Sequence, residues 1–223
     1  MLYIVSTPIG NLKDITLRAI ETLKSVDLIA AEDTRHTKIL LDAHGITTPT
    51  TSYFEHNQIS KGDYLLKLLK EGRDIALVTD AGTPGVSDPG YALIHLAQKN
   101  NIPVTVVPGV TAAIAALTAS GLPSHAFVFE GFLPVKSGAR RKKLESLKHE
   151  ERTAIFYESP HRLLKTFKDI EEVLGNPVVV CARELTKKFE EIRRETAAEL
   201  TEHFTRHKPK GEFVLLINRN DSF

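Results

Sequence analysis

The sequence is organised around Ile75-Ala76-Leu77-Val78-Thr79, followed directly by Asp80-Ala81-Gly82-Thr83-Pro84-Gly85-Val86-Ser87-Asp88-Pro89-Gly90. The first five residues form an apolar, β-branched run that predicts a buried strand. The next eleven are rich in Gly, Pro and Asp, which shape loops, and Asp88 with Pro89 predicts the start of a helix. Open α/β sheets bind ligands at loops that follow their strands, so this stretch predicts a ligand site.

On both sides of this stretch, strands alternate with helices. Such alternation through residue 121 predicts a mainly parallel α/β domain over residues 1–121. Residues 122–124 are expected to link it to a second α/β domain over residues 125–223, with a mixed sheet and an edge strand near residue 190. The predicted helices begin near residues 14, 37, 61, 89, 160 and 197, with Ser159 as the cap of the fifth of these.

Composition limits the class of protein. The chain has 223 residues, of which 42% are hydrophobic and 26% charged, enough for two domains with hydrophobic cores. We expect a cytoplasmic protein without membrane contact, because no secretory signal is evident and the apolar run at 110–122 is interrupted and too short to span a bilayer. The single Cys181 excludes an intramolecular disulfide and reads as a buried strand residue.

Several common catalytic motifs are absent. The first strand and its loop lack Gly-x-Gly-x-x-Gly, the Lys136-Ser137 pair lacks the preceding glycine of a Walker loop, and Ser87 lacks the nucleophile elbow. His36 and His56, the histidines near the polar strand ends, lack metal-ligand spacing beside a suitable carboxylate, so no metal is expected.

Polar side chains follow several of the predicted strands. Residues 32–36 either cap a helix, with Asp33 or Thr34 as the cap, or face a substrate. The basic segment 136–143, with Lys187 and Lys188, either contacts phosphates or forms the solvated face of a helix. If both domains turn the carboxyl ends of their strands toward one cleft, these loops meet there.

Six stretches together resemble one known family. They are Ser6–Asn11, Glu32–Arg35, Asp80–Gly90, Pro108–Ala112, Tyr157–Arg162 and Arg183–Lys187. In this order they are similar to the small-subunit ribosomal RNA methyltransferases within the tetrapyrrole-methylase-like (class III) S-adenosylmethionine-dependent methyltransferases. The longer loop around Gly82-Thr83-Pro84 favours the RNA-modifying branch over the relatives that act on tetrapyrroles.

The resemblance implies a two-domain enzyme, usually a homodimer, that binds S-adenosylmethionine in the cleft between its domains. It implies methylation of the ribose 2′-hydroxyl of a cytidine in the decoding region of 16S rRNA, on the small ribosomal subunit, with no DNA partner. A tetrapyrrole C-methyltransferase and a non-catalytic RNA-binding assembly module are the alternatives.

The resemblance also implies site residues. The residues expected to bind the methyl donor are Pro8, Gly10, Thr83, Pro84, Val86, Thr111, Ala112, Tyr157, Ala182, Glu212 and Phe213. A ribose hydroxyl is a weak acid, so a general base or a cation near the developing alkoxide is also expected. The catalytic candidates, all near strand ends, are Glu32, Asp33, Arg35, Glu158, Arg183 and Lys187.

Overall fold

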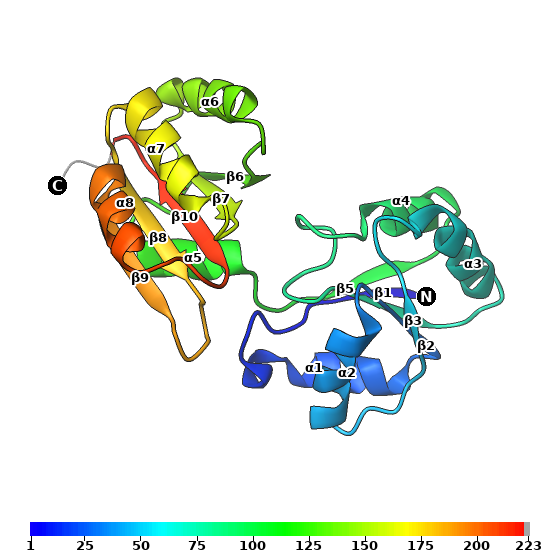
Figure 1. Cartoon of the computed structure of the whole chain (residues 1–223). Helices are drawn as coiled ribbons and strands as arrows, with labels where there is room; N and C mark the ends of the chain where they lie inside the picture. The colour runs from blue at the N-terminus through cyan, green and yellow to red at the C-terminus, as the bar shows by residue number, and fades with distance from the viewer. Residues whose placement is uncertain (221–223) are drawn as a thin grey trace. The chain divides into compact units, whose positions relative to one another are not determined.

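A computed structural model describes residues 1–220. Its contacts divide the chain into two units, Met1–Thr111 and a second that begins at Ala112, and each unit contains one five-stranded sheet (Figure 1). The two domains expected from the sequence, 1–121 and 125–223, stay a prediction. The contacts group residues 112–120 with the second unit.

The first unit is a parallel sheet with the strand order β3-β2-β4-β1-β5. The strands are β1 Leu2–Val5, β2 Leu28–Ala31, β3 Thr50–Ser52, β4 Ile75–Val78 and β5 Val104–Val107. In the shared register, Leu2 lies opposite both Ile75 and Val104. The predicted parallel α/β fold is therefore confirmed for this part of the chain.

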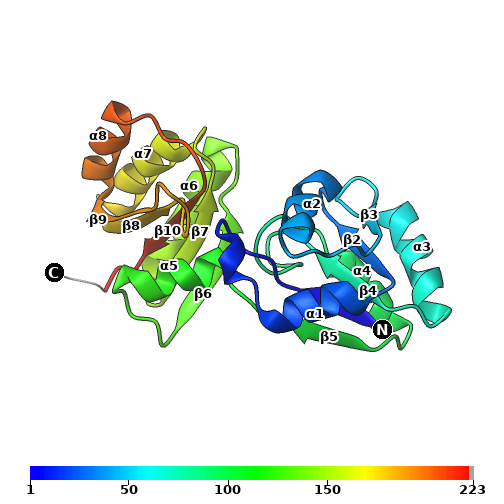
Figure 2. The same ribbon diagram turned by 90° about the horizontal axis from the view of Figure 1, so that it is seen from below.

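Helices cover both faces of this sheet, which explains why β4 is apolar throughout (Figure 2). They are α1 Leu17–Ser25, α2 Thr34–Ala43, α3 Gln58–Lys70 and α4 Tyr91–Lys99. The short 3₁₀ helix η1 Leu12–Asp14 precedes α1 and buries no residue. On one face, Leu23 of α1 and Leu41 of α2 pack with Ala76 and Val78. On the other face, helices α3 and α4 pack against Ile75 and Leu77.

The second unit is a mixed sheet with the order β6-β7-β10-β8-β9, as expected from the sequence. Strand β6 is parallel to β7 and the other neighbours are antiparallel. The strands are β6 Phe127–Phe132, β7 Thr153–Glu158, β8 Val178–Arg183, β9 Glu191–Thr196 and β10 Phe213–Ile217. The helices are α5 Ala112–Ser120, α6 Ser137–Ser146, the 3₁₀ helix η2 Leu147–His149, α7 Leu163–Leu174 and α8 Ala197–Arg206.

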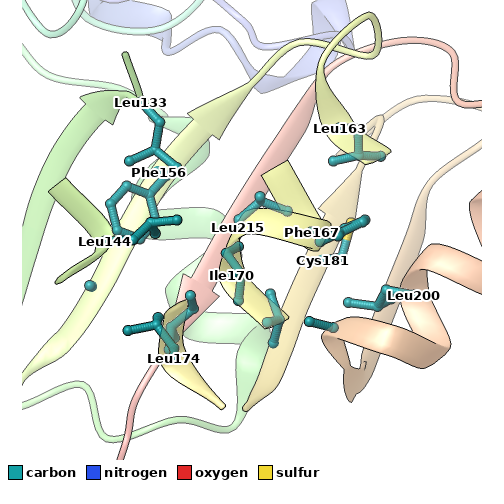
Figure 3. Packing of buried hydrophobic residues seen from close by; sticks show 14 of the residues in the cluster. Leu133, Leu144, Phe156, Leu163, Phe167, Ile170, Leu174, Cys181, Leu200 and Leu215 are labelled. Atoms are coloured by element: carbon teal, nitrogen blue, oxygen red, sulfur yellow. The ribbon is translucent and has the colours of Figure 1, made fainter. Parts of the chain in front are cut away.

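The core of the second unit lies between one face of its sheet and helices α6, α7 and α8. Figure 3 shows Phe167 and Ile170 of α7 beside Leu215 and Cys181 of the strands. Helix α5 covers the other face, where it contacts β10, β7, β8 and β9 (Figure 2). Burial raises the pKa of the Cys181 thiol, since the thiolate loses its hydration there. Cys181 is thus a buried strand residue, as predicted.

Five of the six predicted helix starts differ from the structure. Helices α2 and α3 begin at Thr34 and Gln58, three residues before the predicted positions. Helix α4 begins at Tyr91 with Gly90 as its cap, and α7 begins at Leu163 with Arg162 as its cap, so neither Asp88 nor Ser159 caps a helix. Residues 159–162 instead form a turn in which Arg162 N donates to Ser159 O. The first predicted helix splits into η1 and α1, because Thr16 caps α1 through its side chain. None of the helices within residues 1–220 is long and apolar enough to cross a lipid bilayer.

Helix α6 carries much of the basic segment 136–143, and part of that charge is used inside the fold. The Arg140 side chain is only 4% exposed, with its Nη2 2.6 Å from Asp169 Oδ2 on α7. Arg140 Nε also donates to the same oxygen, and Nη1 donates to Val135 O. Lys143 pairs with Glu130 on β6. These cations hold α6 against its neighbours. The segment 136–143 therefore does not present all of its positive charges for binding phosphates.

The Asp169→Ala substitution should destabilise the protein by about 3–5 kcal/mol, because it leaves the Arg140 guanidinium buried without a counter-ion. Urea unfolding measures the change. Glu172→Ala is the matched control: it removes an exposed partner of Arg141 on the same helix and should cost below ~1 kcal/mol. Equal effects of the two substitutions would show that the Arg140 pair does not hold α6 in place.

Candidate functional site

The loops after β1 and β4 are joined by backbone hydrogen bonds. Thr7 N donates to Gly82 O at 2.8 Å, and Gly82 N donates to Thr7 O at 3.1 Å, which makes a small antiparallel bridge. Thr7 Oγ1 also donates to Thr79 O at 3.0 Å. Ser6 Oγ lies 2.8 Å from Thr83 Oγ1, within hydrogen-bonding distance. The predicted donor-binding residues Pro8, Gly10, Thr83, Pro84 and Val86 therefore lie on two loops that are fixed to each other.

The loop after β5 joins the same group. Ser6 N donates to Val107 O, the last residue of β5. A Cβ atom on Gly109 would come within 2.8 Å of Ser6 Cβ, closer than real Cβ contacts allow. Gly109 thus permits the backbones after β1 and β5 to approach each other. Thr111, another predicted donor-binding residue, follows shortly after Gly109 and is half-buried.

The loop over residues 80–90 folds back on itself, so that Gly85 and Gly90 lie close together. Gly90 has a φ of 152°, and a Cβ there would meet the backbone nitrogen of Gly85 at 2.9 Å. Ser87 adopts a φ of 63°, which is uncommon for a residue with a side chain. The loop shape is therefore set by backbone packing, and Pro84 is buried within it.

Carboxylates gather where β2 and β4 end. Thr79 Oγ1 donates to Glu32 Oε2 at 2.5 Å, and Asp80 N lies 3.3 Å from the same oxygen. Asp33 N donates to Asp80 Oδ1 at 3.1 Å. Burial raises the pKa of Asp80, and the nearby charges of Glu32 and Asp33 act in the same direction. Asp80 was not among the catalytic candidates from the sequence, because only the fold places it between two other carboxylates.

Asp33 and Arg35 form an exposed pair at the start of α2. Arg35 Nη2 lies 3.0 Å from Asp33 Oδ2, and Arg35 N donates to Asp33 Oδ1, so Asp33 caps the helix. The hydrogen bonds from the Arg35 side chain and backbone lower the pKa of Asp33 to about 2. A carboxylate with so low a pKa is a weak proton acceptor near neutral pH. The capping alternative for residues 32–36 is confirmed for Asp33.

In the second unit, one row of residues crosses all five strands. Val214 of β10 pairs in register with both Tyr157 of β7 and Ala182 of β8. The row continues to Phe132 of β6 and Ile192 of β9. Paired residues share one face of a sheet, and the Tyr157 and Phe132 rings are 5.7 Å apart. Two predicted donor-binding residues, Tyr157 and Ala182, therefore belong to one apolar row.

The catalytic candidate Glu158 is buried and bonded to neighbouring side chains of the fold. Its side chain is fully buried and accepts hydrogen bonds from Thr166 Oγ1 at 2.6 Å and from Ser159 N at 2.7 Å. Arg162 Nη2 lies 2.7 Å from Glu158 Oε1, the oxygen that also accepts from Ser159 N, and Arg162 Nη1 donates to Leu133 O. These contacts fasten the end of β7 to helix α7. Its proposed part in proton removal stays a prediction.

Arg183, the last residue of β8, and Lys187 in the following loop are the remaining catalytic candidates, and both have ion-pair partners. Arg183 Nε donates to Lys210 O at 2.8 Å, and its Nη1 lies 3.3 Å from Glu191. Lys187 Nζ lies 3.0 Å from Glu184 and 2.8 Å from Glu212. Glu212 is thus an ion-pair partner at the start of β10.

Phe213 and Ala112 complete the predicted donor-binding set. The Phe213 side chain packs in the helix-facing core, with its ring 5.5 Å from that of Phe204, so its side chain does not face a ligand. Ala112 is the first residue of α5 and belongs to the second unit. The assignment of both residues to donor binding stays a prediction.

Comparison with known proteins identifies the family. Residues 1–201 match the tetrapyrrole (corrin/porphyrin) methylases. The chain is 54% identical over 218 residues to the Ribosomal RNA small subunit methyltransferase I of Synechocystis sp., covering 97% of this chain and 78% of the relative. The chain belongs to the tetrapyrrole methylase family and, within it, to the ribosomal RNA small subunit methyltransferase I group. The family resemblance inferred from the six stretches is confirmed.

Other relatives agree with this placement. Proteins of the same name from Escherichia coli O157:H7 and Thermotoga maritima are 52% and 48% identical, each over 97% of this chain, and are covered to 77% and 97% of their own length. The solved structure of the methyltransferase CobJ has a TM-score of 0.75 at 19% identity, covering 100% of this chain and 95% of that one. Diphthine synthase has a TM-score of 0.77 at 12% identity, with 100% and 91% covered. These two likenesses show the tetrapyrrole methylase fold.

The contact at Gly109 predicts the effect of adding one methyl group. Gly109→Ala should destabilise the protein by about 1–3 kcal/mol, because the new Cβ pushes Ser6 away from the end of β5. Urea unfolding provides the measurement. Gly138→Ala is the control: it lies in α6 with no atom near the new Cβ, so it should be neutral or stabilising by up to ~1 kcal/mol. Equal stability of the two variants would mean that the two backbones do not need this close approach.

Proposed function

We propose that this protein transfers a methyl group from S-adenosylmethionine to the ribose 2′-hydroxyl of a cytidine in the decoding region of 16S rRNA, on the small ribosomal subunit. The observation that carries the proposal is the 48–54% identity, over 97% of the chain, to relatives named as small-subunit ribosomal RNA methyltransferases. A tetrapyrrole substrate is suggested by the description of the matched family and by structures near 20% identity, a level that supports a shared fold alone. The relatives at 48–54% identity are named for ribosomal RNA instead. The cytoplasmic location and the homodimer implied by the resemblance stay predictions.

The fixed loops of the first unit are proposed to hold the methyl donor. Residues on the loops after β1, β4 and β5 are tied together by the Thr7–Gly82 bridge and the Ser6–Thr83 contact. A structural neighbour of the same fold was solved with S-adenosyl homocysteine, which supports a donor site in this family. Donor contacts from Ala112, Tyr157, Ala182, Glu212 and Phe213 belong to the second unit and stay predictions.

The donor supplies its methyl group from a sulfonium cation, so the protein needs to align the reactants and keep water out more than to form a covalent intermediate. This requirement explains why the sequence has no motif for a catalytic nucleophile. Proton removal from the ribose hydroxyl requires an acceptor whose pKa lies nearer to neutral than that of an ordinary carboxylate. Asp80 fits this need because burial raises its pKa, whereas Arg35 lowers that of Asp33.

We therefore propose Asp80 as the general base, with Glu32 as the neighbour that orients the loop. Glu32 accepts from Thr79 and Asp80 N, so its carboxylate fixes the backbone at the start of the loop. Its negative charge also raises the pKa of Asp80. The hydrogen bond from Asp33 N and the charge of His36 lower the pKa of Asp80, whereas burial, the largest cause, raises it.

The methyl-transfer activity can be tested directly. Purified protein, labelled S-adenosylmethionine and small subunits from cells lacking the enzyme should yield a ribose methyl group that resists alkaline cleavage. Thr83→Phe should weaken donor binding by at least about tenfold in calorimetry, since a bulky ring replaces a side chain packed on Ser6. Thr205→Phe, the same change on exposed helix α8, serves as the control and should bind normally.

Four kinds of result would contradict these assignments. Label on a base, or no label, would exclude the 2′-hydroxyl as acceptor. No donor binding by the wild-type protein would favour the RNA-binding assembly module, while methylation of a porphyrinoid precursor would favour the tetrapyrrole enzyme. Unchanged donor affinity in Thr83→Phe would place the donor away from these loops.

The role of Asp80 predicts a pH dependence. The base works in its ionised form, so the rate should fall as the pH drops through the raised pKa of Asp80. Asp80→Asn should lower kcat by about 10²- to 10⁴-fold and remove this acidic limb, with little change in donor affinity. Asp63→Asn, an exposed carboxylate on α3, is the control and should retain full activity. An Asp80→Asn variant with a normal rate and an intact acidic limb would rule Asp80 out.

A further inference from the structure

The connection between β8 and β9, residues 184–190, is a rigid loop. Glu184 and Thr186 adopt positive φ values of 50° and 68°, which residues with side chains rarely adopt. Backbone hydrogen bonds join Lys187 N to Glu184 O and Glu190 N to Lys187 O. Leu185 is buried at 8% exposure and anchors the loop to the body of the unit. The loop therefore has one defined conformation.

A second loop, residues 207–212, lies against the first. Glu184 N donates to Glu212 O, and Glu212 N donates to Glu184 Oε1, both at 3.0 Å. Gly211 has a φ of 90°, which favours glycine, and a Cβ there would displace the Glu184 carboxylate from its present position. Arg183 adds its bond to Lys210 O. Figure 1 shows the tip of the β8–β9 connection and the segment leading into β10 at the same end of the sheet.

The ion pairs within these loops leave a cationic surface. Lys187 forms ion pairs with Glu184 and Glu212, and Glu190 accepts a hydrogen bond from Thr186 N. Lys188, Lys208 and Lys210 are exposed, and in residues 1–220 none of the three has an ion pair with a carboxylate. Their charges are therefore directed to solvent from two loops that are bonded together.

An exposed aromatic ring lies among these charges. Phe189 is 65% exposed, and Lys188 Nζ lies 5.7 Å from the centre of its ring. Burying this ring in the protein would stabilise the fold, yet the rigid loop holds it in water. Exposed aromatic rings beside lysines are the chemistry that binds single-stranded nucleic acid, because bases stack on the ring and phosphates contact the cations.

We propose that residues 184–190 and 207–212 form a contact surface for single-stranded RNA, in which Phe189 stacks on an unpaired base and Lys188, Lys208 and Lys210 contact phosphates. This surface rests on the proposed function, since it assigns part of the recognition of the RNA acceptor to the second unit. It keeps only Lys188 from the sequence-based alternative in which the segment 136–143, Lys187 and Lys188 contact phosphates. Lys187, Arg140 and Lys143 are held in ion pairs of the fold instead.

The lysines are tested by the salt dependence of binding. The probe is a fluorescent single-stranded RNA of about 12 nucleotides, titrated with the full chain at several salt concentrations. Replacing two phosphate contacts in Lys208→Ala/Lys210→Ala should reduce the slope of log K against log salt by about 1.4. The control Lys142→Ala/Lys165→Ala removes two exposed lysines from other parts of the second unit and should keep the wild-type slope. An equal slope in both double variants would overturn the lysine contacts.

The ring is tested by substitution at one position. Phe189→Ala should weaken RNA binding by roughly 5- to 150-fold, whereas Phe189→Tyr should bind like the wild type because it keeps a stacking face. Phe189→Leu, which keeps an apolar side chain without an aromatic face, should behave like Phe189→Ala. Equal binding by all three variants would overturn the stacking role. A change in oligomeric state with unaltered RNA binding would assign the ring to a protein interface and also overturn the proposal.

Two further measurements separate this inference from the proposed function. The loop variants should bind S-adenosylmethionine with wild-type affinity and should raise KM for small subunits more than they lower kcat. If the wild-type protein binds RNA through these loops but methylates no subunit, the proposed function fails and the RNA surface stands. If methylation proceeds with an unchanged KM in Phe189→Ala and Lys208→Ala/Lys210→Ala, the surface fails and the function stands.

Discussion

The backbone bridge between Thr7 and Gly82 is the constraint on which the candidate donor site depends. It joins the loops after the neighbouring strands β1 and β4 of the parallel sheet, and the close approach of Gly109 to Ser6 adds the loop after β5. Backbone groups therefore set the positions of these loops, and few charged side chains are needed. A site of this kind can bind a donor through shape and peptide groups, which agrees with the absence of a charged binding motif in residues 80–90.

The strands could be predicted from the sequence better than the helix starts. The apolar runs at 2–5, 28–31 and 75–78 match strands β1, β2 and β4, because both faces of a parallel sheet are buried. The starts of α4 and α7 were missed because Pro89 and Pro160 lie in turns that precede the helices. A helix-start motif specifies a favourable cap, and the packing of the loop decides which residue takes that position.

The roles of the charged candidates depended on partners that are distant in the sequence. Glu158 is enclosed by Thr166 and Arg162, and Lys187 by Glu184 and Glu212. Nothing in the local sequence distinguishes such paired residues from solvent-exposed charges such as Lys208. The same reason hid Asp80, whose perturbed pKa arises from burial beside carboxylates of another strand. The residue types in the sequence predicted which side chains could take part in catalysis. The fold decided which of them are free of ion-pair partners.

The buried Cys181 gives the second unit a thiol that the first unit lacks. It is the single cysteine of the sequence and sits in the core under α7, so a thiol reagent can reach it only when that part of the second unit opens. The first unit has no thiol. The rate of alkylation therefore reports opening of one unit alone, without an introduced label. The same burial protects the protein from forming disulfide-linked oligomers in its folded state.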